Sequence, residues 1–466
     1  MAGYDYSQSN TQTIDLNDPR DIIAKSPMSV TQILIVAITI GLNALDGFDV
    51  ASISYASPGI AKEWGIDRGA LGVVLSMELI GMALGSMFLG GVADKIGRRR
   101  TVLGCITVMA VGMFMATTVR GLVDLSIWRV ITGLGIGGML AAINAVSAEF
   151  SNTRRRDLCV SLMSIGYPVG AVTGGLLAAR LLVSYDWRSV FYLGASATTI
   201  LIPVVFFFLP ESVHWLSQKQ TPGALDQINK TLRRLGHAAV RSLPSLPAAA
   251  RTQSVADIFK PGLLHITVLV TLAYFFHIVT FYFILKWVPK IVADFGFPAS
   301  SAAGVLVWTN VGGALGGTLL GILTIRFGVK GLTIGAMILA TAAVGLFGQT
   351  PQDLTLLSAV CAFAGFFTNA AIVGLYALFA KAFPTHVRAS GTGVAIGVGR
   401  GGSVLAPIIA GYLFEAGYTL PTVSLMMAFG STMAAAVLLL LKLDTEGSAR
   451  TISQREPEVK LKGAEA

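Results

Sequence analysis

Long apolar runs recur along the chain and are separated by short polar stretches. Each run has about the length that an α-helix needs to cross the roughly 30 Å of hydrocarbon in a membrane. The pattern predicts an all-α membrane protein with twelve spanning helices. They lie roughly at residues 30–56, 69–92, 101–119, 124–149, 158–183, 188–209, 262–287, 301–325, 331–348, 354–382, 389–414 and 420–441.

Composition excludes a soluble protein. Of the 466 residues, 54% are hydrophobic and only 13% are charged, which is too few charges for a soluble surface. The basic residues fall mostly in alternate loops, which the positive-inside rule places in the cytoplasm. These loops contain Lys95, Arg98, Arg99 and Arg100; Arg154, Arg155 and Arg156; the 210–261 segment; Arg326 and Lys330; and Lys381 and Arg388. The net charge of +9 therefore reflects topology, and we expect no nucleic-acid partner.

The two ends of the chain are polar. Residues 1–28 contain no short apolar core followed by a small-residue cleavage site, so we expect a cytoplasmic N-terminal tail and no cleaved signal. An even number of helices returns residues 442–466 to the same side as a second cytoplasmic tail.

The chain contains an internal repeat. At a shift of 231 residues, the segment 81–85, "GMALG", falls on 312–316, "GGALG". Farther along, the shift becomes 233 and pairs Arg155 with Arg388. The repeat predicts two six-helix halves of the same orientation, with a substrate site between them near mid-depth. The halves are residues 29–209 and 262–441, joined by a cytoplasmic linker at 210–261.

The sequence offers no covalent chemistry. Cys105, Cys159 and Cys361 are too scattered for a disulfide framework, and we interpret them as packing residues. No cluster of His, Cys and carboxylate has metal-ligand spacing, and no nucleotide-binding loop or nucleophile elbow is present. We therefore expect no enzyme, no metal site and no cofactor.

Three acids and one arginine interrupt the apolar runs. Asp46 and Asp49 share one helical face because they are three residues apart, and Glu78 and Arg129 lie in the second and fourth helices. All lie about 22 to 31 Å from the cytoplasmic ends of their helices, so they share one layer. Ionisable groups at such depths mark transport or proton-transfer sites. We predict that these four residues couple transport to a proton gradient, which serves as the energy source.

The acids suit that task chemically. Two adjacent carboxyl groups in a poorly solvated site would not both ionise, and Arg129 is the nearest cation that could compensate. An acid balanced in this way can take up a proton outside and release it inside. The alternative is that Asp46, Asp49 and Arg129 form a neutralised structural group between helices 1 and 4, although Glu78 would then be a surplus carboxylate.

Several motifs resemble those of a known transporter family. "GGVADKIGRRR" matches the Gly-x-x-x-Asp-Arg/Lys-x-Gly-Arg/Lys-Arg/Lys signature between helices 2 and 3 of the major facilitator superfamily. "RVITGLGIGG" resembles its helix-4 pattern, and "PESVHWL" resembles its Pro-Glu-Ser motif after helix 6. The resemblance implies the major facilitator fold. The residues that match the first signature are Gly90, Asp94, Lys95, Gly97, Arg98 and Arg99.

Within that superfamily, four short segments resemble motifs of the aromatic acid:proton symporters. They are "DGFD", "NAVSAEF", "FPTHVRASGTG" and "GVGRGGSVLAP". The resemblance implies that Asp46 and Asp49 serve transport, that Arg129 and Asn144 line helix 4, and that Arg400 lies in the cavity. The family also takes related organic acids, so the ligand stays open within that class.

Arg400 is the candidate substrate anchor. A carboxylate that leaves water needs a fixed cation, and a guanidinium offers it a bidentate match. Arg400 lies about 17 Å into helix 11, where glycines leave room beside it. In the alternatives, Arg129 is the anchor, or Arg400 satisfies backbone carbonyls or pairs with an acid such as Asp46.

The second half keeps none of these acids. The repeat places His277 at the position of Asp46 and Thr309 at that of Glu78, so we expect proton handling in the first half and substrate contacts in the second. His277 is either a substrate or proton site or an interhelical hydrogen-bonding residue. Aromatic residues could form flat walls for a substrate ring or serve as packing. These are Tyr167, Tyr274, Tyr282, Trp308 and Tyr376, and we choose Tyr167, Trp308 and Tyr376 as substrate contacts.

The signature between helices 2 and 3 is the predicted gate. An acid at a cytoplasmic helix end can bridge to the other half, and we expect Asp94 to face the amino end of helix 11 near residues 390–391. The family resemblance implies that this motif helps to hold the outward-facing state. The alternative is a plain turn with solvated charges. The gate residues are Gly90, Asp94, Gly97, Arg98, Arg99, Glu149 and Arg155.

Together these patterns predict a proton-coupled symporter that imports an organic anion, most simply an aromatic carboxylate, by alternating access of its halves. We place it in the bacterial inner membrane as a monomer whose partners are the bilayer, the organic acid and protons. One alternative is a proton-driven antiporter that exports a small molecule. Another is a transporter-like sensor that binds ligand without moving it, against which the coupling acids and the gate motif argue.

Overall fold

The computed structural model describes residues 18–89, 91–244, 258–383 and 387–441, and every regular element in them is a helix. Twelve helices are long and apolar enough to cross a membrane. The prediction of an all-α membrane protein with twelve spanning helices is therefore confirmed. The first group of spans consists of α2 (Val30–Trp64), α3 (Arg68–Leu89), α5 (Arg98–Ala116), α6 (Leu122–Glu149), α7 (Arg156–Ser184) and α8 (Arg188–Phe208). The second consists of α11 (Pro261–Asp294), α12 (Ala299–Arg326), α13 (Val329–Phe347), α14 (Leu354–Ala382), α15 (Arg388–Gly399) with α16 (Gly401–Glu415), and α17 (Leu420–Leu440).

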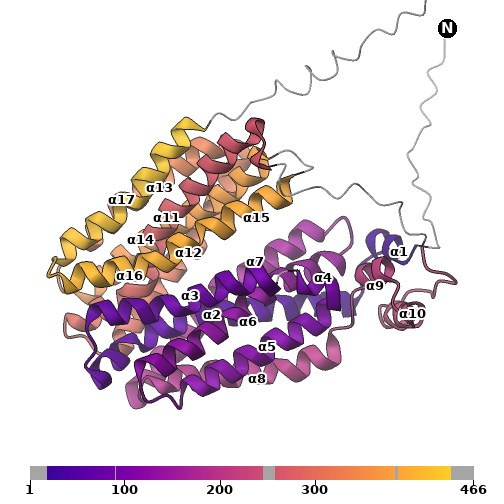
Figure 1. Cartoon of the computed structure of the whole chain (residues 1–466), viewed down its shortest axis with the longest axis horizontal. Helices are drawn as coiled ribbons and strands as arrows, with labels where there is room; N and C mark the ends of the chain where they lie inside the picture. The colour runs from indigo at the N-terminus through magenta and orange to yellow at the C-terminus, as the bar shows by residue number, and fades with distance from the viewer. Residues whose placement is uncertain (1–17, 90, 245–257, 384–386, 442–466) are drawn as a thin grey trace, which may run out of the picture.

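The two groups, which we call the N half and the C half, repeat the same helix pairings. In the N half α3 packs on α6, and α5 packs on α6 and α8. In the C half α12 packs on α14, and α13 packs on α14 and α17. Figure 1 shows the halves as two separate bundles, with the N half in indigo to magenta and the C half in red to yellow.

Glycines allow the paired helices to touch through their backbones. A Cβ atom at Gly133 of α6 would lie 2.1 Å from the Glu78 carbonyl oxygen of α3, and one at Gly137 would lie 2.2 Å from that of Met82. The equivalent contact in the C half is equally close. A Cβ at Gly365 of α14 would lie 2.0 Å from the Thr309 carbonyl oxygen of α12. Close approach of small residues is a common way to pack helices in a membrane. Here it brings Glu78 against the helix that carries Arg129.

Helix α2 continues beyond its predicted end at residue 56 and contains Pro58. A proline inside a helix has no N–H to donate to the carbonyl four residues earlier, which here is that of Ser54. The Ser57 hydroxyl donates to this oxygen at 2.9 Å. The side chain therefore replaces the missing backbone hydrogen bond, as membrane helices often require.

The predicted eleventh span is irregular at one residue, Arg400, where α15 and α16 meet, and we call this point the break. The Arg400 N–H still donates to the Ile396 carbonyl at 2.9 Å, so the two helices form one span. Gly399, Gly401 and Gly402 flank the break, and glycine is a poor helix former. Four short helices also lie outside the predicted spans: α1 (Pro19–Lys25) in the predicted tail, α4 (Val92–Ile96) in the first gate loop, and α9 (Val213–Lys219) and α10 (Ala224–Arg234) in the predicted linker.

The halves touch at one end of the bundle and diverge at the other. We call the end at which α3 begins the closed end, where Arg68 pairs with Asp294 at 2.9 Å and the Ser76 hydroxyl donates to the Val404 carbonyl at 2.7 Å. The open end carries α1, α9 and α10, and there the bundles splay apart in Figure 1. In the part of the chain that the structure describes, no ion pair joins the halves at the open end.

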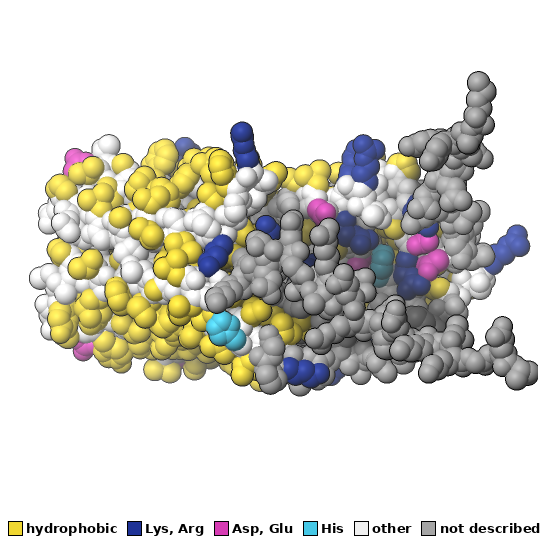
Figure 2. All heavy atoms as spheres, turned by 90° about the horizontal axis from the view of Figure 1, so that it is seen from above, with side chains coloured by type: hydrophobic (Ala, Val, Ile, Leu, Met, Phe, Trp, Pro, Cys, Tyr) yellow, Lys and Arg dark blue, Asp and Glu magenta, His cyan; other side chains and the backbone are white. Residues whose placement is uncertain are grey.

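The surface of the bundle is apolar along the spans. Large side chains such as Phe114, Leu176 and Phe207 are more than half exposed. In Figure 2 hydrophobic side chains cover much of the visible face, while most Lys and Arg side chains gather toward the end with the short helices. Exposed apolar area of this extent fits a lipid environment.

Glycine substitutions test the close packing. Gly170 of α7 leaves no space for a side chain, because its Cβ would lie 1.7 Å from the Ala44 carbonyl oxygen of α2, whereas a Cβ at Gly41 would have nothing within 4 Å. We expect Gly170→Val to destabilise the folded protein by about 3 kcal/mol or more and Gly41→Val to change little. Thermal unfolding in detergent measures both variants, and equal unfolding temperatures would contradict the packing described.

Candidate functional site

The predicted charge layer is assembled at the centre of the N half. Asp46, Asp49, Glu78 and Arg129 are all at most 2% exposed. Arg129 Nη2 forms an ion pair with Glu78 Oε1 and donates a hydrogen bond to the Asp49 backbone carbonyl at 3.0 Å. Residues from α2, α3 and α6 therefore converge as the depths along the helices predicted.

Neighbouring side chains fix the Arg129 guanidinium. Its Nη1 donates to the Met113 sulfur at 3.1 Å, and its Cζ lies 5.3 Å from the centre of the Phe191 ring. A cation held over an aromatic face in a dry site gains additional electrostatic stabilisation. Arg129 thus has partners on α2, α3, α5 and α8 and is held inside the N half.

The carboxyl groups of Asp46 and Asp49 have no such partners. None of their four oxygens has a hydrogen-bond partner among the described residues. Glu78 and Arg400 lie within electrostatic range of Asp46. An ionised carboxylate that is buried without a hydrogen bond is costly, so these two acids are the least compensated groups of the layer.

A second buried cation, Lys286 of α11, reaches this layer from the C half. Its side chain is fully buried, its Nζ donates to the Val50 carbonyl, and it lies 3.6 Å from Glu78 Oε2. Glu78 therefore lies between two cations, one from each half. Sequence reasoning missed Lys286, although a lysine inside a long apolar run is itself a signal of function.

Arg400 lies at the break between α15 and α16 and faces the N half. Its Nη1 donates to the Ser86 hydroxyl at 3.0 Å, and among the residues with described positions it forms no ion pair. Four tyrosines lie around it, and two of them, Tyr274 and Tyr376, place their hydroxyls 3.3 Å apart. The other two are Tyr167 and Tyr282. A guanidinium has several N–H donors, so most of those on Arg400 are available to an anion.

The glycines around Arg400 have a different role from the expected one. A Cβ at Gly399 would lie 2.3 Å from the Tyr274 ring, and one at Gly402 would lie 2.3 Å from the Phe275 carbonyl oxygen. They therefore let α11 approach the break closely, while Gly397 is the glycine beside open space.

A cavity of about 50 Å³ lies between the halves, and Tyr167 is the one residue of its lining that also lies near Arg400. Tyr167 contributes from the N half, and polar groups of Asn310 and Asn369 contribute from the C half. The side-chain amides of both asparagines donate to helix carbonyls, at 2.9 Å and 2.6 Å respectively. Apolar walls and a few polar groups are typical of a small-molecule site. The remaining lining residues are Pro168, Phe281, Ile284, Leu285, Thr309, Gly313, Gly365 and Thr368.

Three predicted substrate contacts lie elsewhere or are already engaged. His277 is fully buried and uses both ring nitrogens between helices, with Ser431 Oγ at 2.9 Å and the Thr368 carbonyl at 2.8 Å, so the structure favours its interhelical alternative. Asn144 donates to the Leu140 carbonyl of its own helix at 2.9 Å.

Trp308 faces lipid. It is 54% exposed and shares one helical face with Leu315 and Ile322, which are seven and fourteen residues further along and equally exposed. Asn310, which lines the cavity, lies about 200° around the same helix. We therefore leave Trp308 out of the site.

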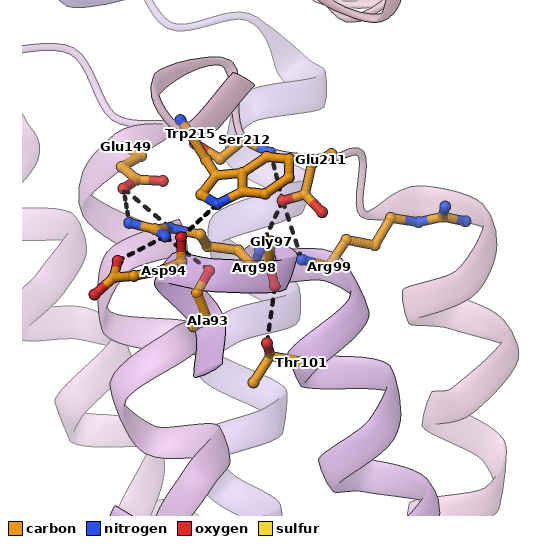
Figure 3. A network of polar contacts seen from close by, with 10 residues as sticks. All are labelled: Ala93, Asp94, Gly97, Arg98, Arg99, Thr101, Glu149, Glu211, Ser212 and Trp215. Carbon is orange, nitrogen blue, oxygen red and sulfur yellow. Dashed lines mark hydrogen bonds and ion pairs between the residues drawn. The ribbon is translucent and has the colours of Figure 1, made fainter. Parts of the chain in front are cut away.

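The gate residues form a network within the N half (Figure 3). Arg98 pairs with Asp94 at 2.8 Å and with Glu149 at 3.0 Å. The Glu211 carboxylate accepts hydrogen bonds from the backbone N–H groups of Arg98 and Arg99, at 2.7 Å and 3.2 Å. Two charges of the loop, Asp94 and Arg98, are thus paired rather than merely solvated, and Glu211 is a member of the network that we did not predict.

The position of Gly97 explains its place in the motif. Its φ of +106° is one that other residues rarely adopt, and a Cβ there would lie 2.3 Å from the Glu211 carboxylate. Arg155 is exposed and forms no ion pair with any described residue, and Gly90 lies outside the described residues. Asp94 is paired inside the N half and not with helix 11, which differs from our expectation. The halves are apart at this end, so the predicted bridge would need the opposite conformation.

Comparison with known proteins decides the family. A family model described as Major Facilitator Superfamily matches residues 39–309 and 270–464, which together cover most of the chain. The chain belongs to the major facilitator superfamily. It is therefore a multi-pass membrane transporter and not an enzyme.

Several relatives within the superfamily are described as transporters of aromatic acids. The chain is 30% identical to the 4-hydroxybenzoate transporter of Acinetobacter baylyi, over 95% of this chain and 97% of the relative. It is 28% identical to the gallate transporter of Pseudomonas putida, over 91% and 94%. The inward-open xylose transporter of Escherichia coli matches with a TM-score of 0.70 at 17% identity, over 90% of this chain and 98% of that one, which shows the shared fold.

The gate network of this transporter predicts a kinetic phenotype. The Asp94 side chain is 73% exposed, so its pair with Arg98 adds little to stability. We expect Asp94→Asn to slow turnover several-fold while substrate affinity and unfolding temperature stay close to those of the wild type, because the gate is remote from the cavity. Calorimetry and uptake rates measure these effects. A large loss of affinity at normal turnover would contradict this role.

Proposed function

We propose that this transporter is a proton-coupled symporter that imports an aromatic carboxylate by alternating access. The observation that carries the proposal is that the acids of α2 and Arg400 each lack a partner among the described residues. Two buried acids of α2 lack hydrogen-bond partners, and a half-buried arginine at the α15–α16 break has no acid paired with it among the described residues. The first can hold a proton and the second can hold an anion.

The proton site is Asp46 and Asp49, with Glu78 and Arg129 as the fixed charges around them. Arg129 already has an acid and a backbone carbonyl to satisfy. The charge of Arg129 therefore compensates that of Glu78. The two aspartates are then free to titrate as the cavity opens to either side.

The anion site is Arg400 with the tyrosines around it. A benzoate-like substrate would place its carboxylate on the guanidinium and its ring against Tyr167, Tyr274 or Tyr376. The names of the relatives, which include 4-hydroxybenzoate and gallate transporters, support this substrate class. Asp46 lies within electrostatic range of Arg400, so a proton on Asp46 would strengthen anion binding at Arg400.

The contacts between the halves support alternating access. They are joined at the closed end and apart at the open end. The basic residues gather at the open end, which supports placing that end and both termini in the cytoplasm of a bacterial inner membrane. The conformation described is then the inward-facing one, and rocking of the two halves would produce its counterpart. We propose that the monomer is the working unit.

Transport by purified protein in vesicles tests this function. An inward proton gradient should drive accumulation of labelled 4-hydroxybenzoate or gallate, and an uncoupler should abolish it. Extrusion under the same gradient would instead establish the antiporter alternative. Binding without any net movement would establish a sensor.

Neutralising the aspartates should uncouple transport. An amide keeps the shape of the side chain but cannot carry the proton, so we expect Asp46→Asn and Asp49→Asn each to reduce gradient-driven accumulation to the level of empty vesicles. The exposed acid Asp124 at the start of α6 supplies the control, and Asp124→Asn should accumulate substrate normally. Undiminished accumulation in both aspartate variants would exclude the coupling role.

Changing Arg400 should remove substrate binding. We expect Arg400→Lys to weaken affinity at least several-fold, because the ammonium lacks the bidentate geometry, and Arg400→Ala to abolish binding. Calorimetry on purified protein measures affinity without transport. Unchanged affinity in Arg400→Ala with transport lost would move this arginine from recognition to coupling.

A further inference from the structure

Lys286 is a buried charge to which the proposed function gives no role. It is fully buried in α11, among the largest side chains hidden from solvent. The hydrogen bond and ion pair of its ammonium group reach Val50 of α2 and Glu78 of α3, both in the N half. Its neighbour Trp287 is held within the C half by a hydrogen bond to the Pro407 carbonyl at 3.2 Å.

The contact lies on the closed side of the layer of acids. Lys286 is two helical turns before Asp294, whose ion pair with Arg68 marks the closed end. The same region holds a close approach of α3 to α16, where a Cβ at Gly72 would lie 2.4 Å from the Pro407 carbonyl oxygen. Opening of the closed end would therefore carry Lys286 away from both of its partners.

The charges around Lys286 make that separation costly in free energy. The acid that faces it is Glu78, and the other cation of the group, Arg129, is anchored inside the N half. Glu78 has one oxygen toward each cation. Removing one partner of a buried ion pair leaves an uncompensated charge, which strongly disfavours the separated arrangement.

We propose that Lys286 is a positioning residue that ties the closing of the halves to the layer of acids, an inference that rests on the proposed function. Its ion pair with Glu78 holds the closed end shut in the conformation described. The pair breaks when that end opens, and Glu78 then depends on Arg129 alone. In this way the position of the C half, which lacks acids of its own in this layer, depends on the charge of Glu78 in the N half.

Distances between spin labels test the proposal without substrate or gradient. One label pair at Ser184 and Thr419 reports on the closed end, and a second at Asp157 and Arg326 reports on the open end; all four positions are exposed. The three buried cysteines are replaced by alanine in this background. We expect Lys286→Gln to raise the population with a long closed-end distance by about threefold or more, with a matching shortening at the open end.

Companion variants separate the ion pair from a packing effect. Lys286→Met keeps the length of the side chain and should behave like Lys286→Gln, whereas Lys286→Arg should restore the wild-type distribution. Glu78→Gln should open the closed end similarly, and the double variant Lys286→Gln, Glu78→Gln should add nothing to either single change. The exposed lysine Lys62 near the same end supplies the control, and Lys62→Gln should leave both distances unchanged.

Two outcomes would overturn the proposal. One is an unchanged distance distribution in folded Lys286→Gln or Lys286→Met, and the other is strict additivity of the Lys286 and Glu78 changes. Because the distances need no transport, a protein that fails to accumulate aromatic acids but still opens on loss of Lys286 would contradict the proposed function and leave this inference standing.

Discussion

The ion pair between Glu78 and Arg129 is the interaction on which the rest of this structure depends. Both side chains are fully buried, so neither charge could exist there alone. The pair forms because glycines let the backbones of α3 and α6 touch, which a side chain at Gly133 would prevent. Helix packing therefore creates the electrostatic centre, and that centre holds the N half together around it.

Because Arg129 pairs with Glu78, it does not compensate the two aspartates of α2. Among the residues that the structure describes, Asp46 and Asp49 have no hydrogen-bond partners for their carboxyl groups, and Arg400 has no acid paired with it. Unpaired acids in the N half and an unpaired cation from the C half suit the joint movement of a proton and an anion. Binding of the proton lowers the free energy of binding the anion, and binding of the anion does the same for the proton.

Much of this arrangement could be predicted from the sequence, because apolar length and depth along a helix are properties of the chain alone. These two properties predict the twelve spans and the layer of Asp46, Glu78 and Arg129. Lys286 was missed because the repeat comparison followed the acids of the N half. The side of α12 that carries Trp308 could not be assigned, since that helix is apolar all round. The partner of Asp94 depends on conformation, and one sequence encodes both conformations.

Proton movement caused by substrate alone tests the central claim most directly. Purified protein in vesicles that contain a pH-sensitive dye, with no imposed gradient, is mixed with external 4-hydroxybenzoate, and protein-free vesicles correct for passive entry of the acid. The account predicts acidification of the interior that depends on the protein and is lost in Asp46→Asn. Substrate uptake without proton movement, or with alkalinisation of the interior, would contradict it.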